Sequence, residues 1–145
     1  MIDCTIQDVI DAANARRERR KPVQRESREQ QAVVMYARIR WPEVPIVCST
    51  GGKKMSGKTK WQRIKQGATN KREGYEKGTP DLFFAAARHR VHGLFIEMKD
   101  VDETPSSVTD DQHRFMARAE AQGYQCMVCF GHAEAEKVLD EYFEI

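Results

Sequence analysis

The sequence has no long apolar run. Hydrophobic residues make up 40% of its 145 positions and charged residues 32%, and no apolar stretch approaches the roughly 20 residues that a transmembrane helix needs. Near the N-terminus the charged residues follow the apolar ones, the reverse of their order in a secretory signal. These absences predict an intracellular, cytoplasmic protein without membrane contact. The length predicts one domain, because a chain of this size does not supply two independent cores.

Cysteine is also scarce, with four in the chain. Cys126 and Cys129 form a C-x-x-C pattern, but neither a second such pair nor a suitably spaced pair of histidines accompanies it, as a zinc site would require. Both lie in YQCMVCF, an apolar run rich in strand-forming residues, and residues three apart on a strand point to opposite faces. We therefore expect reduced, buried thiols instead of a zinc site.

Acidic residues are few in the middle of the chain. Residues 51–77 contain nine Lys or Arg and two Asp or Glu, whereas residues 100–145 contain three and eleven. Such a basic segment predicts contact with the phosphates of nucleic acid, and the alternative is a solvated loop. Trp61 in this segment can stack on a base or pack the segment against the domain. The candidate DNA-binding residues are Lys53, Lys54, Lys58, Lys60, Arg63 and Lys65.

Apolar periodicity and turn residues predict alternating helices and strands. Strands are expected in VPIVCST, DLFFAAA, GLFIEMK and YQCMVCF, and helices over residues 28–40, within KTKWQRIKQGA, between Thr109 and Gly123, and over 132–143. The two middle strands are expected to form an antiparallel hairpin. This order indicates an α/β fold with a mixed four-stranded sheet flanked by helices. Residues 1–26 are expected to form an N-terminal arm and residues 27–145 the domain, with 51–77 as an insertion.

Two expected helices start with a capping box, in which Ser or Thr is followed three places later by Glu or Gln. Ser27 with Gln30 predicts the start of the first helix, and Thr109 with Gln112 predicts the start of the helix after the hairpin. The terminal helix should bury Ala135, Val138, Leu139 and Tyr142, which recur at helical spacing.

The two hairpin strands each carry a carboxylate. Asp81 lies at the start of the first, while Glu97 and Lys99 lie two residues apart in the second and so share a face, with Leu94, Ile96 and Met98 toward the core. Antiparallel pairing brings Asp81 toward Glu97, and two close carboxylates repel unless a cation lies between them. Mg²⁺ suits this place because it prefers oxygen ligands.

This pattern, PD followed after fifteen residues by EMK, resembles the PD-(D/E)xK nuclease superfamily. The segments GTPDLFF, LFIEMK, TDDQHRF and QGYQCMVC, with an upstream helix that carries a glutamate, resemble more narrowly the small stand-alone VRR-NUC domains found in phages. The resemblance spans residues 27–143. It implies a Mg²⁺-dependent endonuclease that hydrolyses DNA phosphodiester bonds, with Mn²⁺ able to substitute.

The resemblance also implies roles for individual residues. Asp81, Glu97 and the Met98 carbonyl would hold the metal, and Lys99 would assist the attacking water. Glu29 on the upstream helix would complete the acidic cluster, although an acid there also favours the helix dipole. Gln112 would be a further site residue, or only the capping residue described above.

Stand-alone members of this family, which this chain resembles, act as two-fold dimers on four-way (Holliday) junctions. The resemblance therefore implies a homodimer that prefers branched DNA, and it allows a phage origin with action in the host cytoplasm. Ile6, Val9 and Ile10 form an apolar stripe near the N-terminus that is the expected interface, and the alternative is that this stripe folds back on its own domain. The alternative is a non-catalytic nucleic-acid-binding module on a nuclease fold. Two intact carboxylates argue against it, because without a metal they would repel a polyanion.

Overall fold

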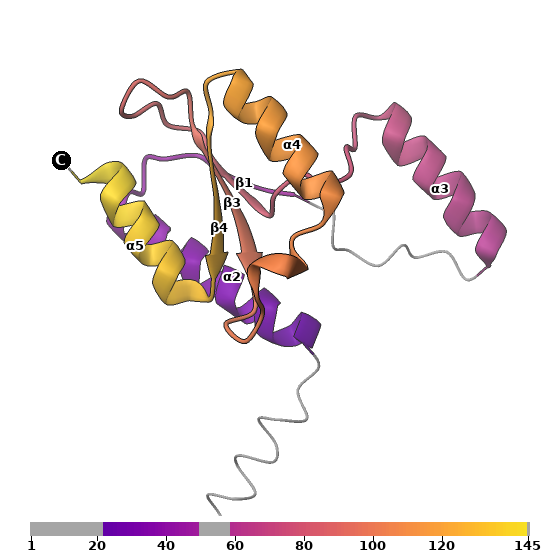
Figure 1. Cartoon of the computed structure of the whole chain (residues 1–145), viewed down its shortest axis with the longest axis horizontal. Coiled ribbons are helices and arrows are strands. Elements are labelled where there is room, and N and C mark those ends of the chain that lie inside the picture. Colours follow the sequence, from indigo (N-terminus) through magenta and orange to yellow (C-terminus); the bar gives the residue numbers. More distant parts are fainter. Residues whose placement is uncertain (1–21, 50–58, 145) are drawn as a thin grey trace, which may run out of the picture.

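Four strands form one sheet in the order in which they occur along the chain (Figure 1). The computed structural model describes residues 22–49 and 59–144. β1 pairs with β2 and β2 with β3 in antiparallel fashion, whereas β3 and β4 are parallel. The sheet is therefore mixed, as predicted, with β1 and β4 at its edges. The strands are β1 (Ile46–Cys48), β2 (Leu82–Phe84), β3 (Leu94–Lys99) and β4 (Gln125–Phe130).

Helices cover both faces of this sheet. α2 (Pro22–Arg40) and α5 (His132–Phe143) lie side by side on one face, and α4 (Asp110–Ala121) lies on the other (Figure 1). Residues of β3 alternate between the two layers, since Leu94, Ile96 and Met98 are fully buried in the core with α2 and α5. Phe95 points the other way, with its ring centroid 5.4 Å from that of Phe115 on α4. Glu97 and Lys99 share its face, which places them under the N-terminal half of α4.

α2 begins earlier than predicted. The helix runs from Pro22, so Ser27 lies inside it, where its hydroxyl accepts a hydrogen bond from Gln31 (3.2 Å). The prediction of a start at Arg28 with a cap at Ser27 was therefore wrong, and the helix reaches into the expected N-terminal arm. Contacts distant in sequence hold this first part of the helix down: Arg25 lies 3.3 Å from Asp100 and 2.5 Å from Asp102.

The other capping box is formed as predicted. Thr109 accepts a hydrogen bond from the Gln112 backbone, and the Gln112 side chain accepts one from the Thr109 N–H. α5 buries Ala135, Val138, Leu139 and Tyr142, also as predicted. The structure adds a second capping box, between Thr59 and Gln62, at the start of α3 (Lys60–Arg72).

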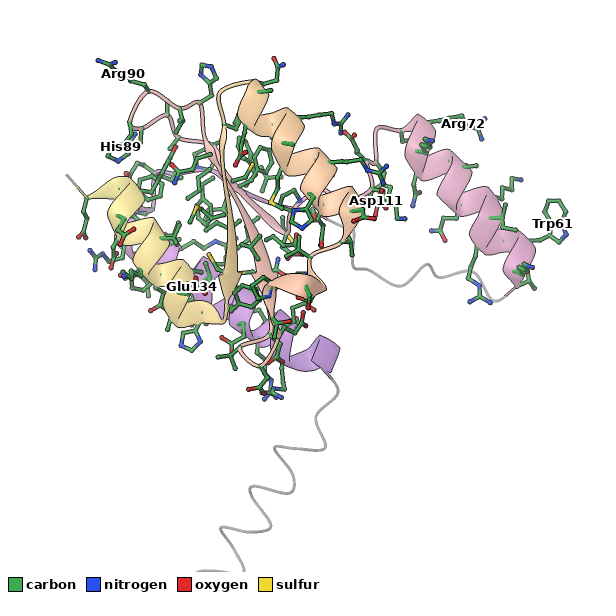
Figure 2. All side chains as sticks on the ribbon, in the orientation of Figure 1. Trp61, Arg72, His89, Arg90, Asp111 and Glu134 are labelled. Carbon is green, nitrogen blue, oxygen red and sulfur yellow. The ribbon has the colours of Figure 1, made fainter. Side chains whose placement is uncertain are left out.

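α3 differs from the other helices in its surroundings. It stands away from the sheet beyond α4 (Figure 1), and none of its residues is buried. Trp61 is 81% exposed and projects outward from the far end of this helix (Figure 2). The Trp61 ring therefore does not pack α3 against the domain, and stacking on a base stays a prediction.

The described cysteines are free. Cys129 is buried and Cys126 is half-buried, and burial raises the pKa of the Cys129 thiol to about 12 and that of Cys126 to about 11. Burial is thus confirmed for Cys129, whereas Cys126 is only half-buried and Cys48 is exposed. Cys4 lies outside the described residues. None of the described helices is long and apolar enough to cross a membrane.

Candidate active site

Asp81 occupies the entrance to β2 and is held there by backbone contacts. Its carbonyl accepts a hydrogen bond from the Ser49 N–H (2.8 Å), and its carboxylate accepts one from the Met98 N–H (2.9 Å). Since Leu82 pairs with Ile96 in an antiparallel register, the next residues outward, Asp81 and Glu97, lie opposite each other. The predicted approach of these two carboxylates is present in the structure.

Glu97 and Lys99 form a buried ion pair on the face of β3 that α4 covers. The Lys99 ammonium lies 3.1 Å from the Glu97 carboxylate, and the two side chains are only 9% and 3% exposed. Gln112 on α4 binds both, because its amide N–H donates to Glu97 and its carbonyl oxygen lies 3.5 Å from the Lys99 nitrogen. Gln112 therefore serves as capping residue and as site residue at the same time. The two roles that sequence left as alternatives are compatible.

Burial and mutual repulsion disfavour charge on these carboxylates. Burial raises the pKa of Glu97 to about 7, the charge of Asp81 adds to this effect, and Lys99 opposes it. Burial also raises the pKa of Asp81, against the Met98 N–H and Lys99. One lysine does not offset the cost of two buried carboxylates, so a cation bound between them would relieve an unfavourable arrangement.

The oxygens at this place fit a hard divalent cation. Glu97 Oε2 is buried and, among the described residues, has no hydrogen-bond partner. Backbone groups of successive β3 residues point to opposite sides of the strand. The Lys99 carbonyl accepts a hydrogen bond from the Gly131 N–H just after β4, whereas the Met98 N–H donates to Asp81 on the β2 side. The N–H and C=O of one strand residue point to the same side, so the Met98 carbonyl faces Asp81 beyond the end of β2. Mg²⁺ takes one or two carboxylates and keeps several waters, which these three oxygen donors allow.

The structure does not bring Glu29 to this pair. Its carboxylate accepts hydrogen bonds from the His132 N–H (2.6 Å) and from the His132 ring (2.5 Å), at the start of α5. Glu26, one turn earlier on α2, lies nearer to the pair and lines one cavity together with Asp81; burial raises its pKa, and the charge of Asp81 raises it further. Glu26 in turn raises the pKa of Glu97. Within the described part of the chain, no three Asp, Glu, His or Cys side chains form a complete metal cluster.

Sequence reasoning missed Glu26 because its position depends on where α2 begins. The ion pair between Arg25 and Asp100, a carboxylate 4% exposed at the end of β3, ties the first turns of α2 to the sheet. Glu26 follows Arg25 directly and so lies beside the site. A signal was available, because Glu26 and Glu29 are three residues apart and share one face of a helix.

Two matched substitutions on α2 test this assignment. Glu26→Gln should weaken Mg²⁺ binding about tenfold, as loss of a supporting group next to a metal commonly does, because it removes one negative charge near Asp81. Glu29→Gln changes the same group one turn further on and should leave Mg²⁺ affinity unchanged. Isothermal titration calorimetry measures both. The opposite ranking of the two variants would restore Glu29 to the metal site.

The predicted DNA-binding residues divide between described and undescribed parts of the chain. Lys60, Arg63 and Lys65 lie on α3 and are exposed. Lys53, Lys54 and Lys58 lie outside the described residues. The three on α3 form part of a helix that contains five Lys or Arg and no Asp or Glu, so this helix presents positive charge without internal compensation.

An aspartate and a Glu-x-Lys segment on adjacent strands of a mixed α/β sheet define the PD-(D/E)xK class of nuclease fold. Residues 15–133 match the model of the VRR-NUC domain, so the chain belongs to this family of nucleases. A solved structure described as a VRR_NUC domain protein aligns with a TM-score of 0.59 and 24% sequence identity, over 83% of this chain and 88% of that one. At this identity the likeness shows the fold. No curated protein matches the sequence.

Proposed function

We propose that this protein is a Mg²⁺-dependent endonuclease that hydrolyses phosphodiester bonds in DNA and prefers branched substrates, with Mn²⁺ able to replace Mg²⁺. The observation that carries the proposal is the buried group formed by Asp81, Glu97 and Lys99, in which the Glu97 pKa is raised to about 7. A structural ion pair has no need of a second carboxylate beside it. A metal site has that need, and membership in a nuclease family agrees with it.

The residues of the site would have different roles in hydrolysis. Asp81, Glu97 and the Met98 carbonyl would hold the cation, which when bound polarises the phosphoryl oxygen and acidifies water. Lys99 places a positive charge 3.1 Å from Glu97, where it would stabilise the negative charge that develops on the attacking water and the phosphoryl oxygens. Gln112 keeps the Glu97 and Lys99 side chains in position through its two hydrogen bonds. Glu26 adds negative charge at the rim of the site and so favours cation binding.

A cleavage assay separates this proposal from the non-catalytic binding module. The purified chain is incubated with end-labelled linear, flapped and four-way-junction DNA, each with Mg²⁺, with Mn²⁺ and with EDTA. The proposal expects cutting with either metal, none with EDTA, and faster cutting of the branched forms. Binding without metal-dependent cutting would establish the module instead.

The basic insertion is expected to supply affinity and not turnover. Replacing Lys60, Arg63 and Lys65 by Gln, alone and with Lys53, Lys54 and Lys58, should flatten the plot of log affinity against log salt by up to roughly 0.9 per lost phosphate contact. Turnover at saturating DNA should stay the same. Lys137→Gln on α5, an exposed lysine, is the control. An unchanged slope in the substituted protein would place the DNA elsewhere.

The protein is expected to be a homodimer, because two sites related by a two-fold axis match a four-way junction, which has an approximate two-fold axis of its own. Light scattering coupled to size exclusion should give about twice the 16.7 kDa of one chain. The proposed interface residues Ile6, Val9 and Ile10 lie outside the described residues, and changing all three to Ser should yield monomers. A wild-type mass of one chain, with equal cutting of linear and four-way DNA, would contradict the dimer.

A further inference from the structure

A groove of about 1,180 Å³ separates α3 from α4. It exceeds the roughly 300 to 1,000 Å³ of common small-molecule sites, so an extended ligand suits it better than a metabolite. Four cations and two acids line it, together with the rings of Tyr75 and Phe115. The cations are Lys71, Lys77, Arg114 and Arg118, and the acids are Glu76 and Asp111.

The charges in the groove favour a polyanion. Both acids are already paired, since Arg118 binds Glu76 while Lys77 and Arg114 bind Asp111. Lys71 has no acidic partner among the described residues, and α3 as a whole carries no acid. A bound peptide or apolar segment would leave this excess of positive charge unmatched, whereas phosphates would neutralise it.

The aromatic rings distinguish a single strand from a duplex. Tyr75 is 38% exposed, and Phe115 packs its edge against Phe95 while also lining the groove. A duplex keeps its bases stacked inside, so it offers these rings only its backbone. Unpaired bases expose their faces and stack on aromatic side chains, beside cations that track the phosphates.

The groove and the active site share a wall. Asp111 lines the groove, and the next residue, Gln112, binds Glu97. On the other side Lys77 leads through Gly78 to Asp81 within four residues. Gly78 adopts a φ of +85°, and a Cβ there would lie 2.2 Å from the Asp111 carbonyl oxygen, so this connection is packed directly onto the start of α4. This end of the groove therefore lies next to the two segments that carry Gln112 and Asp81.

We infer that the groove between α3 and α4 binds a single-stranded segment of the nucleic acid substrate and delivers it to the active site. That the bound segment belongs to a substrate rests on the proposed nuclease function. The binding of single-stranded nucleic acid in the groove does not depend on that function. It explains why α3, a capped helix with no buried residue, is placed opposite α4: it forms the second wall of a channel. It also explains a preference for branched DNA, because flaps and junctions contain unpaired or easily unpaired nucleotides.

Fluorescence anisotropy in EDTA tests the inference without cleavage. The probes are a labelled oligothymidine of about 16 nucleotides, the upper end of common single-strand sites, and a blunt duplex of equal length. Tyr75→Ala should weaken oligothymidine binding about tenfold and duplex binding far less, whereas Tyr75→Phe should bind like the wild type, because stacking requires the ring and not the hydroxyl. Lys71→Gln should reduce the salt slope for the oligothymidine by about 0.7.

Ile64→Ala is the control, because it removes an exposed apolar side chain from α3 that does not line the groove. Circular dichroism and thermal unfolding verify that each variant is folded. Wild-type affinity for the oligothymidine in both Tyr75→Ala and Lys71→Gln would overturn the inference, as would a loss confined to Ile64→Ala. These results are independent of the nuclease proposal. If the groove variants lose oligothymidine binding but the wild type shows no metal-dependent cutting, the nuclease proposal is wrong and the groove inference stands. If the wild type cuts DNA but the groove variants bind oligothymidine normally, the groove inference is wrong and the nuclease proposal stands.

Discussion

Lys99→Ala should lower the rate of DNA cleavage about a thousandfold at saturating Mg²⁺ while leaving Mg²⁺ affinity unchanged or higher. Loss of one group that stabilises transition-state charge commonly costs this much. The Lys99 ammonium lies 3.1 Å from the Glu97 carboxylate and opposes the binding of a second cation there. Its removal should therefore favour metal binding while it slows the chemical step. The cleavage rate should therefore fall while the Mg²⁺ affinity does not, whereas the loss of a merely structural lysine would lower both.

Single-turnover cleavage and calorimetric titration of Mg²⁺ provide the two measurements. Lys137→Ala, which removes an exposed lysine from α5, is the control and should change neither. Folding should be retained, because Met98 and Ile96 still fill the core on the opposite face of β3. Near-normal turnover in Lys99→Ala would show that Lys99 has no catalytic role. A parallel loss of Mg²⁺ affinity and activity would point to disruption of the site.

Glu97→Gln should make the metal-free protein more stable at pH 8. Folding raises the pKa of Glu97 from its ordinary 4.5 to about 7, so between these values the native state binds more protons than the unfolded state. The free energy of unfolding therefore falls as pH rises through this window, by up to about 3 kcal/mol from this one group. Gln resembles the protonated acid and keeps an acceptor for Gln112, so the variant avoids that loss.

Urea unfolding in EDTA at several pH values between about 5 and 8 measures this effect. The stability of the wild type should decrease across the range relative to Glu97→Gln, and Glu141→Gln, which changes an exposed glutamate on α5, should follow the wild type. Added Mg²⁺ should reverse the order, since the cation stabilises only the protein that binds it. If Glu97→Gln is the less stable protein at pH 8 without metal, the ion pair with Lys99 outweighs burial and the site is structural.

The sequence predicted those parts of the site that depend on local spacing. Residues two apart on a strand share a face, so spacing alone placed Glu97 and Lys99 together, and the hairpin brought Asp81 to them. The capping role of Gln112 was predicted from neighbours three residues away, whereas its place beside Glu97 was expected from the family resemblance. In each case the interacting residues are close in the chain or linked by one tight connection.

Sequence reasoning failed where a contact joins distant segments. The start of α2 depends on Arg25 reaching Asp100, 75 residues further along the chain, and no local pattern reveals such a pair. The error of a few residues at the start of α2 changed which glutamate was expected to face the metal. The basic helix α3 was expected, but its separation from the core was not, because periodicity reports which face of a helix is apolar and not what stands opposite it.

The absence of buried residues in α3 bears on how this nuclease can diversify. Most substitutions in a protein are tolerated or rejected according to their effect on folding, but those on α3 alter no core and leave the sheet, with its carboxylates and lysine, as it was. Substitutions on this helix are therefore constrained by the proposed binding of nucleic acid and not by packing of the core. Descendants of such a protein can change the nucleic acids that they bind through substitutions at thirteen positions, none of them buried, while the core and the carboxylate site stay as they are.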